Sequence, residues 1–423
     1  MIKKEAERLE LDKRKYIKGR FKELEAYRDE VWHCNRCNMC KEVFGWYMKS
    51  AEFSEICPSF AFNKYDTYAS QGKMHIARAL IEEEMDWEDS EKLLDIIYSC
   101  DMCGGCNINC LRVLENNPLE IFKALRARAV EKGLARQEHK KLFESTLKYG
   151  NILDAPKEER LKWTEGLDFK IKMLPQERAE VLLYTGCMYA LEPKVRDTLK
   201  VIAQVLKAGG VDFGILGAEE KCCGGMQLMM GEVGMFEQLA KDNIKTFNEL
   251  GIKTLVTPCA HGYNFLVNDY PEVGDMKFEV VHAVQYLERL IEQGKIKMGK
   301  VPREIVTYHD PCDLGRKSGV YDIPRKVLNA IEGVELREME RIKDQTWCCG
   351  AGGGVLEAYP DQAMWAAEER IKEARVTTGA DTLVTACPWC EYSFKSAVEK
   401  SGARIKISDI FELVAKALKK EGE

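Results

Sequence analysis

The sequence lacks any long apolar segment of the kind that crosses a membrane. No run approaches the roughly 18 consecutive apolar residues that mark a membrane-spanning helix. The first residues, MIKKEAERLELDKRKYIKGRFKEL, carry charges throughout, unlike the apolar core of a signal peptide. We therefore expect a cytoplasmic protein that meets a membrane, if at all, as a peripheral subunit held by a partner.

An excess of positive charge is also missing. The chain has 63 basic and 69 acidic residues, a net charge of −6, which argues against nucleic acid as a partner. We find no phosphate-binding loop, flavin motif or Ser–His–Asp motif. These absences disfavour a self-contained nucleotide-dependent enzyme or a serine hydrolase. At 423 residues the chain is long enough for two or three domains.

Cysteine, by contrast, is abundant. The 17 cysteines are odd in number and cluster at short spacings. This pattern is typical of metal binding in a reducing compartment rather than of a disulfide framework.

Eight cysteines precede residue 111 and form two triplets, each with one remote member. Three cysteines separated by two-residue gaps bind one [4Fe–4S] cube. In two-cluster ferredoxins, the remote cysteine of each motif ligates the cube of the other motif. We predict one cubane held by Cys34, Cys37, Cys40 and Cys110, and a second held by Cys100, Cys103, Cys106 and Cys57. Two zinc sites are the alternative, but zinc favours paired CxxC units. A long insertion before Cys57, and Leu111 in place of the usual proline, depart from the ferredoxin pattern.

The surroundings of these motifs have helical periodicity. Apolar residues recur at helical spacing in 73–85 and 119–134. We predict an all-helical, ferredoxin-like domain over residues 1–150, with a long leading helix through about Trp32. The charged stretch from about 140 to 175 has little periodicity and is expected to be a connection.

An internal repeat follows. Cys187 and Cys312 are 125 residues apart, Cys222 and Cys348 are 126 apart, and Cys259 and Cys387 are 128 apart, each within similar sequence. Three landmarks in register indicate two copies of one structural unit. We place these units at residues 176–300 and 301–420.

Each unit is predicted to be α/β. Short β-branched runs at 180–185, 253–257, 304–308 and 381–385 end just before or at a cysteine motif, and helical patterns at 235–251 and 361–379 lie between them. Parallel strands present their carboxyl ends at one edge, where ligands gather. A dinucleotide loop at CCGAGGGV is the alternative, but Val355 stands where its last glycine belongs.

These motifs carry a family resemblance. One cysteine, then CCG, then CxxC resembles the cysteine-rich CCG domain. Two such domains behind a ferredoxin module resemble the family of heterodisulfide reductase catalytic subunits and related iron–sulfur subunits of membrane- and flavoprotein-linked oxidation systems. The resemblance spans about 30–420 and includes YHDPCDLGRKSGVYDIPRKVL, CCGAGGG and IKISDIFELVAKAL. It implies an iron–sulfur oxidoreductase of anaerobic metabolism that works in electron transfer.

The resemblance also implies site residues. A complete CCG motif in this family holds a noncubane [4Fe–4S] cluster with five cysteines, two of them adjacent. On this chain the implied ligands, which we also expect to be the catalytic set, are Cys312, Cys348, Cys349, Cys387 and Cys390. Gly350, Gly352 and Gly353 would let the backbone approach that cofactor.

The first repeat departs from the pattern. Cys187, Cys222, Cys223 and Cys259 are present, but Gly262 stands where the fifth cysteine belongs. This site is expected to hold a further iron–sulfur cluster or zinc. His261 either substitutes as a ligand or is simply hydrogen-bonded. All 17 cysteines are then assigned, and none is left for a disulfide.

Other polar residues near the motifs have two interpretations each. His309 is a catalytic candidate that supplies a proton to a thiolate product, or, with Asp310, orients its loop. Arg316 and Lys317 bind an anionic substrate or are ordinary solvated side chains.

Three functions follow as hypotheses. In the first, a thiol/disulfide small molecule is reduced, or formed, at the noncubane cluster with electrons passed through two cubane clusters from a flavoprotein, a cytochrome b or another redox subunit. In the second, the chain is an electron relay without its own substrate, linking a flavoprotein dehydrogenase or a benzoyl-CoA-reductase-like complex to another carrier. In the third, it is a zinc-stabilised interaction scaffold.

Overall fold

The computed structural model describes residues 23–87, 91–110 and 118–418. Its N-terminal part is helical, without a strand among the described residues up to 131. The elements are η2 (Leu24–Tyr27), α2 (Arg28–Trp32), η3 (Met39–Lys41), α3 (Pro58–Asn63), η4 (Asp66–Tyr68), α4 (Ser70–Ile81), α5 (Glu91–Tyr98), α6 (Gly105–Asn109) and α7 (Pro118–Glu131).

Helices α4 and α7 confirm the two periodic patterns. Met74, Ala77 and Ile81 of α4 are buried at the expected three- and four-residue intervals. The predicted leading helix is different in its described part: a 3-10 turn and the five-residue α2 stand before Cys34. Residues 1–22 and Leu111 lie outside the described residues.

The first α/β half has a five-stranded parallel sheet in the order β1-β3-β2-β4-β5. Its elements are β1 (Lys172–Met173), β2 (Val181–Leu183), α9 (Cys187–Leu191), α10 (Pro193–Ala208), β3 (Phe213–Ile215), η6 (Gly217–Glu219), α11 (Gly225–Met230), α12 (Val233–Leu250), β4 (Thr254–Thr257), α13 (Ala260–Asn268), η7 (Tyr270–Glu272), β5 (Glu279–His282) and α14 (Ala283–Glu292).

The second half repeats this plan with a four-stranded parallel sheet in the order β7-β6-β8-β9. Its elements are β6 (Lys300–Tyr308), α15 (Asp322–Asn329), β7 (Glu332–Leu336), η8 (Lys343–Gln345), α16 (Val355–Ala358), α17 (Pro360–Thr378), β8 (Thr382–Thr385), α18 (Pro388–Ser401), β9 (Lys406–Asp409) and α19 (Ile410–Ala417). The order β3-β2-β4-β5 matches β7-β6-β8-β9, which confirms the α/β prediction.

The predicted connection at 140–175 is wrong in part, because this stretch is structured. It contains most of α8 (Gln137–Tyr149), as well as η5 (Lys157–Thr164) and β1, which extends the first sheet. Its apolar residues are few, so periodicity is weak, yet Leu142, Phe143 and Trp163 are all buried. A sparse apolar face is enough when each of its members packs into the core.

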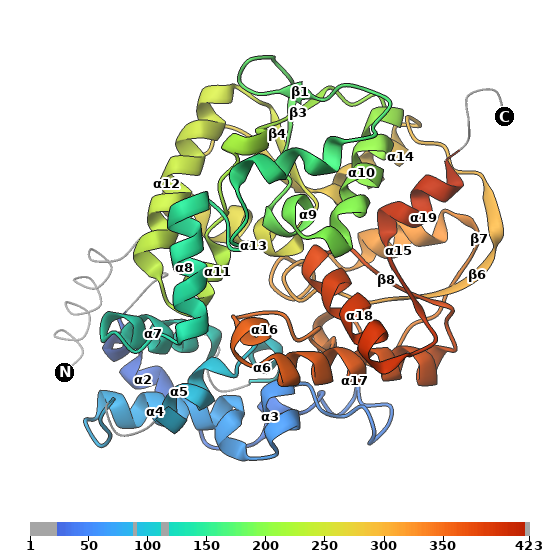
Figure 1. The fold of residues 1–423 in the computed structure, drawn as a ribbon. Coiled ribbons are helices and arrows are strands. Elements are labelled where there is room, and N and C mark those ends of the chain that lie inside the picture. The colour runs from blue at the N-terminus through green and yellow to red at the C-terminus, as the bar shows by residue number, and fades with distance from the viewer. Residues whose placement is uncertain (1–22, 88–90, 111–117, 419–423) are drawn as a thin grey trace.

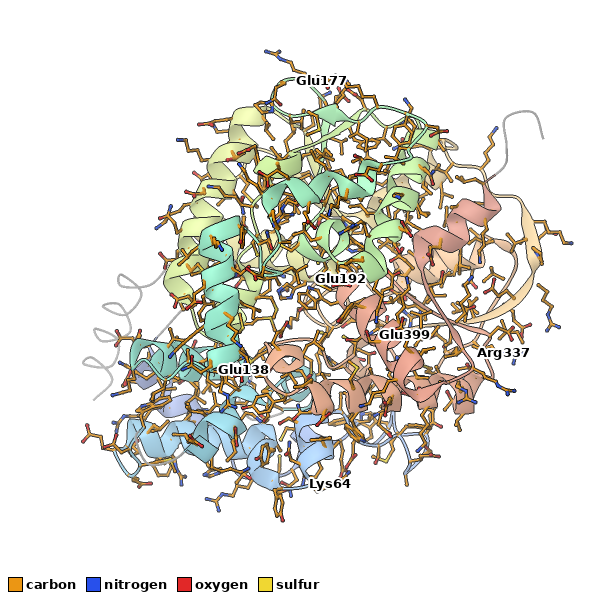
Figure 2. The ribbon with its side chains drawn as sticks, viewed as in Figure 1. Lys64, Glu138, Glu177, Glu192, Arg337 and Glu399 are labelled. Carbon is orange, nitrogen blue, oxygen red and sulfur yellow. The ribbon has the colours of Figure 1, made fainter. Side chains whose placement is uncertain are left out.

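The three parts pack against one another (Figure 1). The ferredoxin-like part lies along the lower edge, where α3 meets α17 and α7 meets α11. Helix α8 rises from it toward the first sheet. Figure 2 shows charged side chains such as Lys64, Glu177 and Arg337 at the outer edge of the molecule. Among the described helices, none combines the length and apolarity that a membrane crossing needs.

Candidate metal centres

The first cysteine triplet lies beside Cys110. Cys34, Cys37, Cys40 and Cys110 line one cavity, together with residues of α4. Arg36 and Asn38 adopt positive φ angles of 59° and 66°, which wind the loop tightly between the cysteines. Cys37 is exposed while Cys40 is buried, so this cavity faces the surface.

The second triplet lies beside Cys57. The Cys106 thiol interacts electrostatically with Cys57, Cys100 and Cys103, and burial raises its pKa well above the usual value. Each triplet thus lies with the other motif's remote cysteine. This is the arrangement that the crosswise ligand assignment requires.

The five cysteines of the second repeat line another cavity. Cys312 follows β6, the adjacent pair precedes α16, and Cys387 and Cys390 stand at the start of α18. The Cys349 side chain interacts with those of Cys348 and Cys390, and these interactions hold the pKa of Cys349 well below its usual value. Four of the five are buried, and Cys312 is the partly exposed one. Five converging sulfur donors are a soft ligand set that suits iron–sulfur chemistry.

The glycine run after the adjacent cysteines packs tightly against protein. A Cβ on Gly350 would overlap the carbonyl oxygen of Ala363 in α17, and a Cβ on Gly352 would overlap that of Asp101. At Gly353, a Cβ would lie 2.7 Å from the Cys100 oxygen. Close approach of the ferredoxin-like loop and α17 therefore explains these glycines without a cofactor. Of the three, Gly352 also lines the cavity and keeps its cofactor-binding interpretation.

The second triplet and the second CCG cavity meet at one contact. The Cys103 and Cys348 side chains lie close together, and their interaction lowers the pKa of Cys103 to about 6 and raises that of Cys348. Arg316 ties the two loops together by donating to the Cys103 oxygen (2.9 Å) and the Asp344 oxygen (2.8 Å). The expectation that Arg316 binds substrate or solvent is therefore wrong, because backbone carbonyls occupy its guanidinium.

Lys317 is likewise engaged within the protein. Its Nζ lies 2.6 Å from Asp313, and both side chains are largely buried. Although burial opposes ionisation, Lys317 and His261 hold the pKa of Asp313 well below its usual range. Lys317 is thus half of an internal ion pair rather than a solvated side chain.

His309 lies beside cysteine sulfurs of the second repeat. Its Nδ1 accepts a hydrogen bond from Arg370 (3.1 Å), so Nε2 carries the proton of the neutral ring. The ring's ligand atom lies within 4.8 Å of the Cys349 and Cys390 sulfurs, and Nε2 has no other partner among the described residues. Burial, with Arg370 beside it, holds the pKa of His309 well below 6.5. Asp310 is paired with Arg325 at 2.7 and 2.9 Å and orients the loop.

The first repeat forms a separate cavity next to this one. Cys187, Cys222, Cys223 and Cys259 line it, with Gly262 beside them. A Cβ on Gly262 would have no neighbour closer than 3.8 Å, so packing does not forbid a side chain there. Met226, His261 and Trp389 line both cavities, and the Cys259 and Cys387 side chains interact across the boundary.

Two buried charged residues near these sites were not predicted from the sequence. Arg160 donates to the Cys187 sulfur (3.2 Å) and to Glu220 (3.0 Å). Asp101 lies between the cysteine sites, with neither carboxylate oxygen hydrogen-bonded among the described residues, and burial raises its pKa well above 3.8. Arg160 sits in the charged stretch that looked like a connection, and no motif marks it.

Comparison with known proteins agrees with this geometry. The cysteine-rich domain family matches residues 181–266 and 306–395, and the 4Fe-4S dicluster domain family matches residues 30–113. A subunit of the dihydromethanophenazine:CoB–CoM heterodisulfide reductase of Methanosarcina mazei is 33% identical over 395 residues, 92% of this chain and 94% of the relative.

Two bacterial relatives are longer proteins. The EtfAB:quinone oxidoreductase of Syntrophomonas wolfei is 30% identical over 82% of this chain and 50% of its own length. The probable iron-sulfur-binding oxidoreductase FadF of Bacillus subtilis is 31% identical over 76% of this chain and 46% of its own length. With its dicluster domain and paired cysteine-rich domains, the chain is an iron–sulfur oxidoreductase subunit that belongs to the family of the Methanosarcina heterodisulfide reductase subunit.

Proposed function

We propose that this subunit reduces a small-molecule disulfide, or forms one in the reverse direction, at its second CCG site, with electrons received through two cubane clusters. The observation that supports the proposal is the close approach of the Cys103 and Cys348 side chains. It joins a ligand of the second predicted cubane to the complete five-cysteine cavity, without intervening residues.

We assign one metal centre to each group of neighbouring cysteines. Two cubanes would be held by the crosswise sets, a noncubane [4Fe–4S] cluster by the five cysteines of the second repeat, and a further iron–sulfur cluster or zinc by the first repeat. Bound at the second repeat, the cluster would supply single electrons and an iron able to take a substrate sulfur.

The chain itself positions the reactants. Cleaving a disulfide breaks the S–S bond, consumes two electrons and two protons, and releases two thiols. The electrons come from a redox partner, such as a flavoprotein or cytochrome b subunit, and enter at the exposed Cys37 side. Cys312, partly exposed, marks the side from which a small molecule reaches the cavity. His309 donates from Nε2 and stabilises a sulfur anion there rather than releasing its own proton.

The relatives suggest which disulfide to try. The Methanosarcina mazei protein is named for a CoB–CoM heterodisulfide, so an unsymmetrical disulfide of two thiol coenzymes is the first candidate. Reduction of such a disulfide would make this chain the substrate-binding subunit of its complex.

A relay without a substrate is the second candidate. It is supported by Gly262, since a two-site disulfide reductase would be expected to keep both CCG motifs complete, and by similarity to an EtfAB:quinone oxidoreductase. In that case electrons would pass between a flavoprotein and another carrier.

An anaerobic assay separates the two candidates. The purified chain is reduced with a one-electron viologen dye and mixed with CoB–CoM heterodisulfide or with simple symmetrical disulfides, and dye oxidation and thiol release are both measured. We expect two dye molecules oxidised and two thiols released per disulfide. Clusters that accept electrons from the dye but release no thiol from any of these disulfides would favour the relay.

A further inference from the structure

We propose that Nε2 of His261 is a ligand of the first CCG site and takes the place of the fifth cysteine that Gly262 lacks. The inference rests on the proposed function only in requiring a cluster at that site. It concerns the ligand set and not the reaction.

The protein partners of His261 set its tautomer. Nδ1 lies 2.9 Å from Asp313 Oδ2. Asp313 also pairs with Lys317 at 2.6 Å and is therefore a carboxylate, which can only accept. In the neutral imidazole Nδ1 must then carry the hydrogen, which leaves the lone pair on Nε2. A ligating histidine is usually oriented in this way, by a carboxylate on one ring nitrogen while the other faces the metal.

Nε2 lies against the glycine turn that follows the adjacent cysteines of the first repeat. It lies 2.8 Å from where a Cβ of Gly225 would be, two residues after Cys223. The ring is held edge-on between Phe265 (4.8 Å) and Trp389 (6.4 Å). The imidazole thus reaches from Asp313 of the second repeat to the cysteine loop of the first.

The Nε2 atom of His261 is buried and unpaired among the described residues. His261 is 5% exposed, and Nε2 has no hydrogen-bond partner there. A buried ring nitrogen left unpaired is costly, so such atoms usually have a partner that completes them. A metal in the cavity that His261 lines together with the four cysteines would be that partner.

His309 provides the contrast. Its Nδ1 accepts from Arg370, so its Nε2 carries hydrogen and cannot offer a lone pair. Of the two histidines at these cavities, His261 is the one prepared to ligate and His309 the one prepared to donate.

A histidine ligand changes the electronic properties of the site. A neutral imidazole in place of an anionic thiolate raises the reduction potential of an iron–sulfur cluster. The variant His261→Cys, which restores an anionic sulfur ligand, is therefore expected to lower the midpoint potential of the first-site cluster.

The test is nitrogen hyperfine spectroscopy of the full chain. Protein labelled with ¹⁵N-histidine is examined by pulsed EPR in oxidised and reduced states. We expect a directly bound nitrogen whose coupling changes with the isotope. The coupling should be lost in His261→Cys and kept in His309→Gln. It should also be kept in His282→Gln, a control at a buried histidine of the same half that lines neither cavity and caps α14 through Nδ1.

Three results would overturn the assignment: no isotope-sensitive bound nitrogen in the wild-type protein, a coupling that survives His261→Cys, or a coupling lost in His309→Gln. The wild-type label needs no variant, so a poorly folding substitution leaves the test intact. If a histidine nitrogen is bound but no disulfide is turned over, the proposed function is contradicted while the assignment of His261 as a ligand stands.

Discussion

Gly262 and Cys390 occupy the same position in the two repeats, three residues after Cys259 and Cys387 respectively. One repeat therefore offers five thiols and the other four. Because the space beside Gly262 is open, the difference lies in chemistry rather than in packing. The two cavities share a wall, so any metal centres held by these unequal sets of thiols would lie side by side.

The inequality predicts unequal responses to thiol. In Cys390→Ser the second site loses a ligand, and the change in the EPR spectrum on adding thiol under oxidising conditions should be abolished. In the matched variant Cys223→Ser that response should survive at least in part. Iron content, measured in both, checks that each change removes ligation at its own site. A full thiol response and full activity in Cys390→Ser would move the relay function ahead.

At the scale of elements, loops that follow parallel strands bring distant cysteines together. Cys187, Cys259, Cys312 and Cys387 each follow a strand directly and lie at the start of a helix or turn. The adjacent pairs come from the longer loops after β3 and β7. A parallel sheet delivers these loops to one edge, which is why each repeat forms one cavity.

The crosswise arrangement of the ferredoxin-like part is tested by Cys57→Ser. Cys57 interacts electrostatically with Cys100 and Cys103, so the change should damage the cluster of the second triplet and leave that of Cys34 intact. EPR of the reduced protein distinguishes the two cubanes, because only one signal should be lost. Selective loss of the Cys34 cluster would contradict the crosswise assignment.

The contact between the glycine loop and the second triplet is tested by Gly352→Ala. The added methyl group would overlap the Asp101 oxygen, and forcing an extra carbon into a packed contact costs about 1–3 kcal/mol. Chemical denaturation measures the loss of unfolding free energy. Gly45→Ala is the control, because a Cβ there meets nothing within 4 Å, and its effect should stay within about 0.5 kcal/mol. Equal stability of the two variants would show that the loops are not packed as described.

At the scale of the molecule, one buried side chain joins all three parts. Arg126 of α7 donates to the carbonyl oxygens of Cys100 (2.7 Å), Met229 (2.8 Å) and Gly353 (2.7 Å). These belong to the ferredoxin-like part, the first repeat and the second repeat. A planar guanidinium can bond several carbonyls at fixed angles, which a single ammonium cannot.

We expect Arg126→Lys to destabilise the whole chain by roughly 3 kcal/mol or more, because several buried carbonyls lose their donor. The control is Arg128→Lys, two residues along the same helix, where a surface ion pair to Glu25 is worth at most about 1 kcal/mol. Thermal unfolding of both variants gives the comparison. A near-neutral Arg126→Lys would mean that the three parts are held together by other contacts.

The proposed need for a separate redox partner is tested on the whole chain. Since no flavin or nicotinamide motif is recognisable, the isolated chain should not oxidise NADH, whereas a low-potential dye should reduce its clusters. The absorbance of NADH and bleaching of the iron–sulfur bands measure the two reactions. NADH oxidation by the pure polypeptide would contradict the need for a separate redox partner.

Much of the architecture was predictable because it depends on patterns among residues that are close in sequence. Cysteine spacing predicted the dicluster part, and the three register offsets predicted the repeat, since both depend only on neighbours in sequence. The helices at α4, α7, α12 and α17 followed from apolar periodicity. The helices and the strand within residues 140–175 could not be predicted from periodicity. The apolar residues there are few, and their burial depends on the core into which they pack.

The sequence alone determined which residues supply sulfur and that one of ten expected thiols in the two CCG motifs is replaced by Gly262. Tertiary structure decided which groups stand around them. The contact of Cys103 with Cys348, the tautomers of His261 and His309, and the burial of Arg160 and Asp101 all depend on residues far apart in the chain. A hydrogen-bond partner is chosen by position in space, and no spacing rule along the sequence records it.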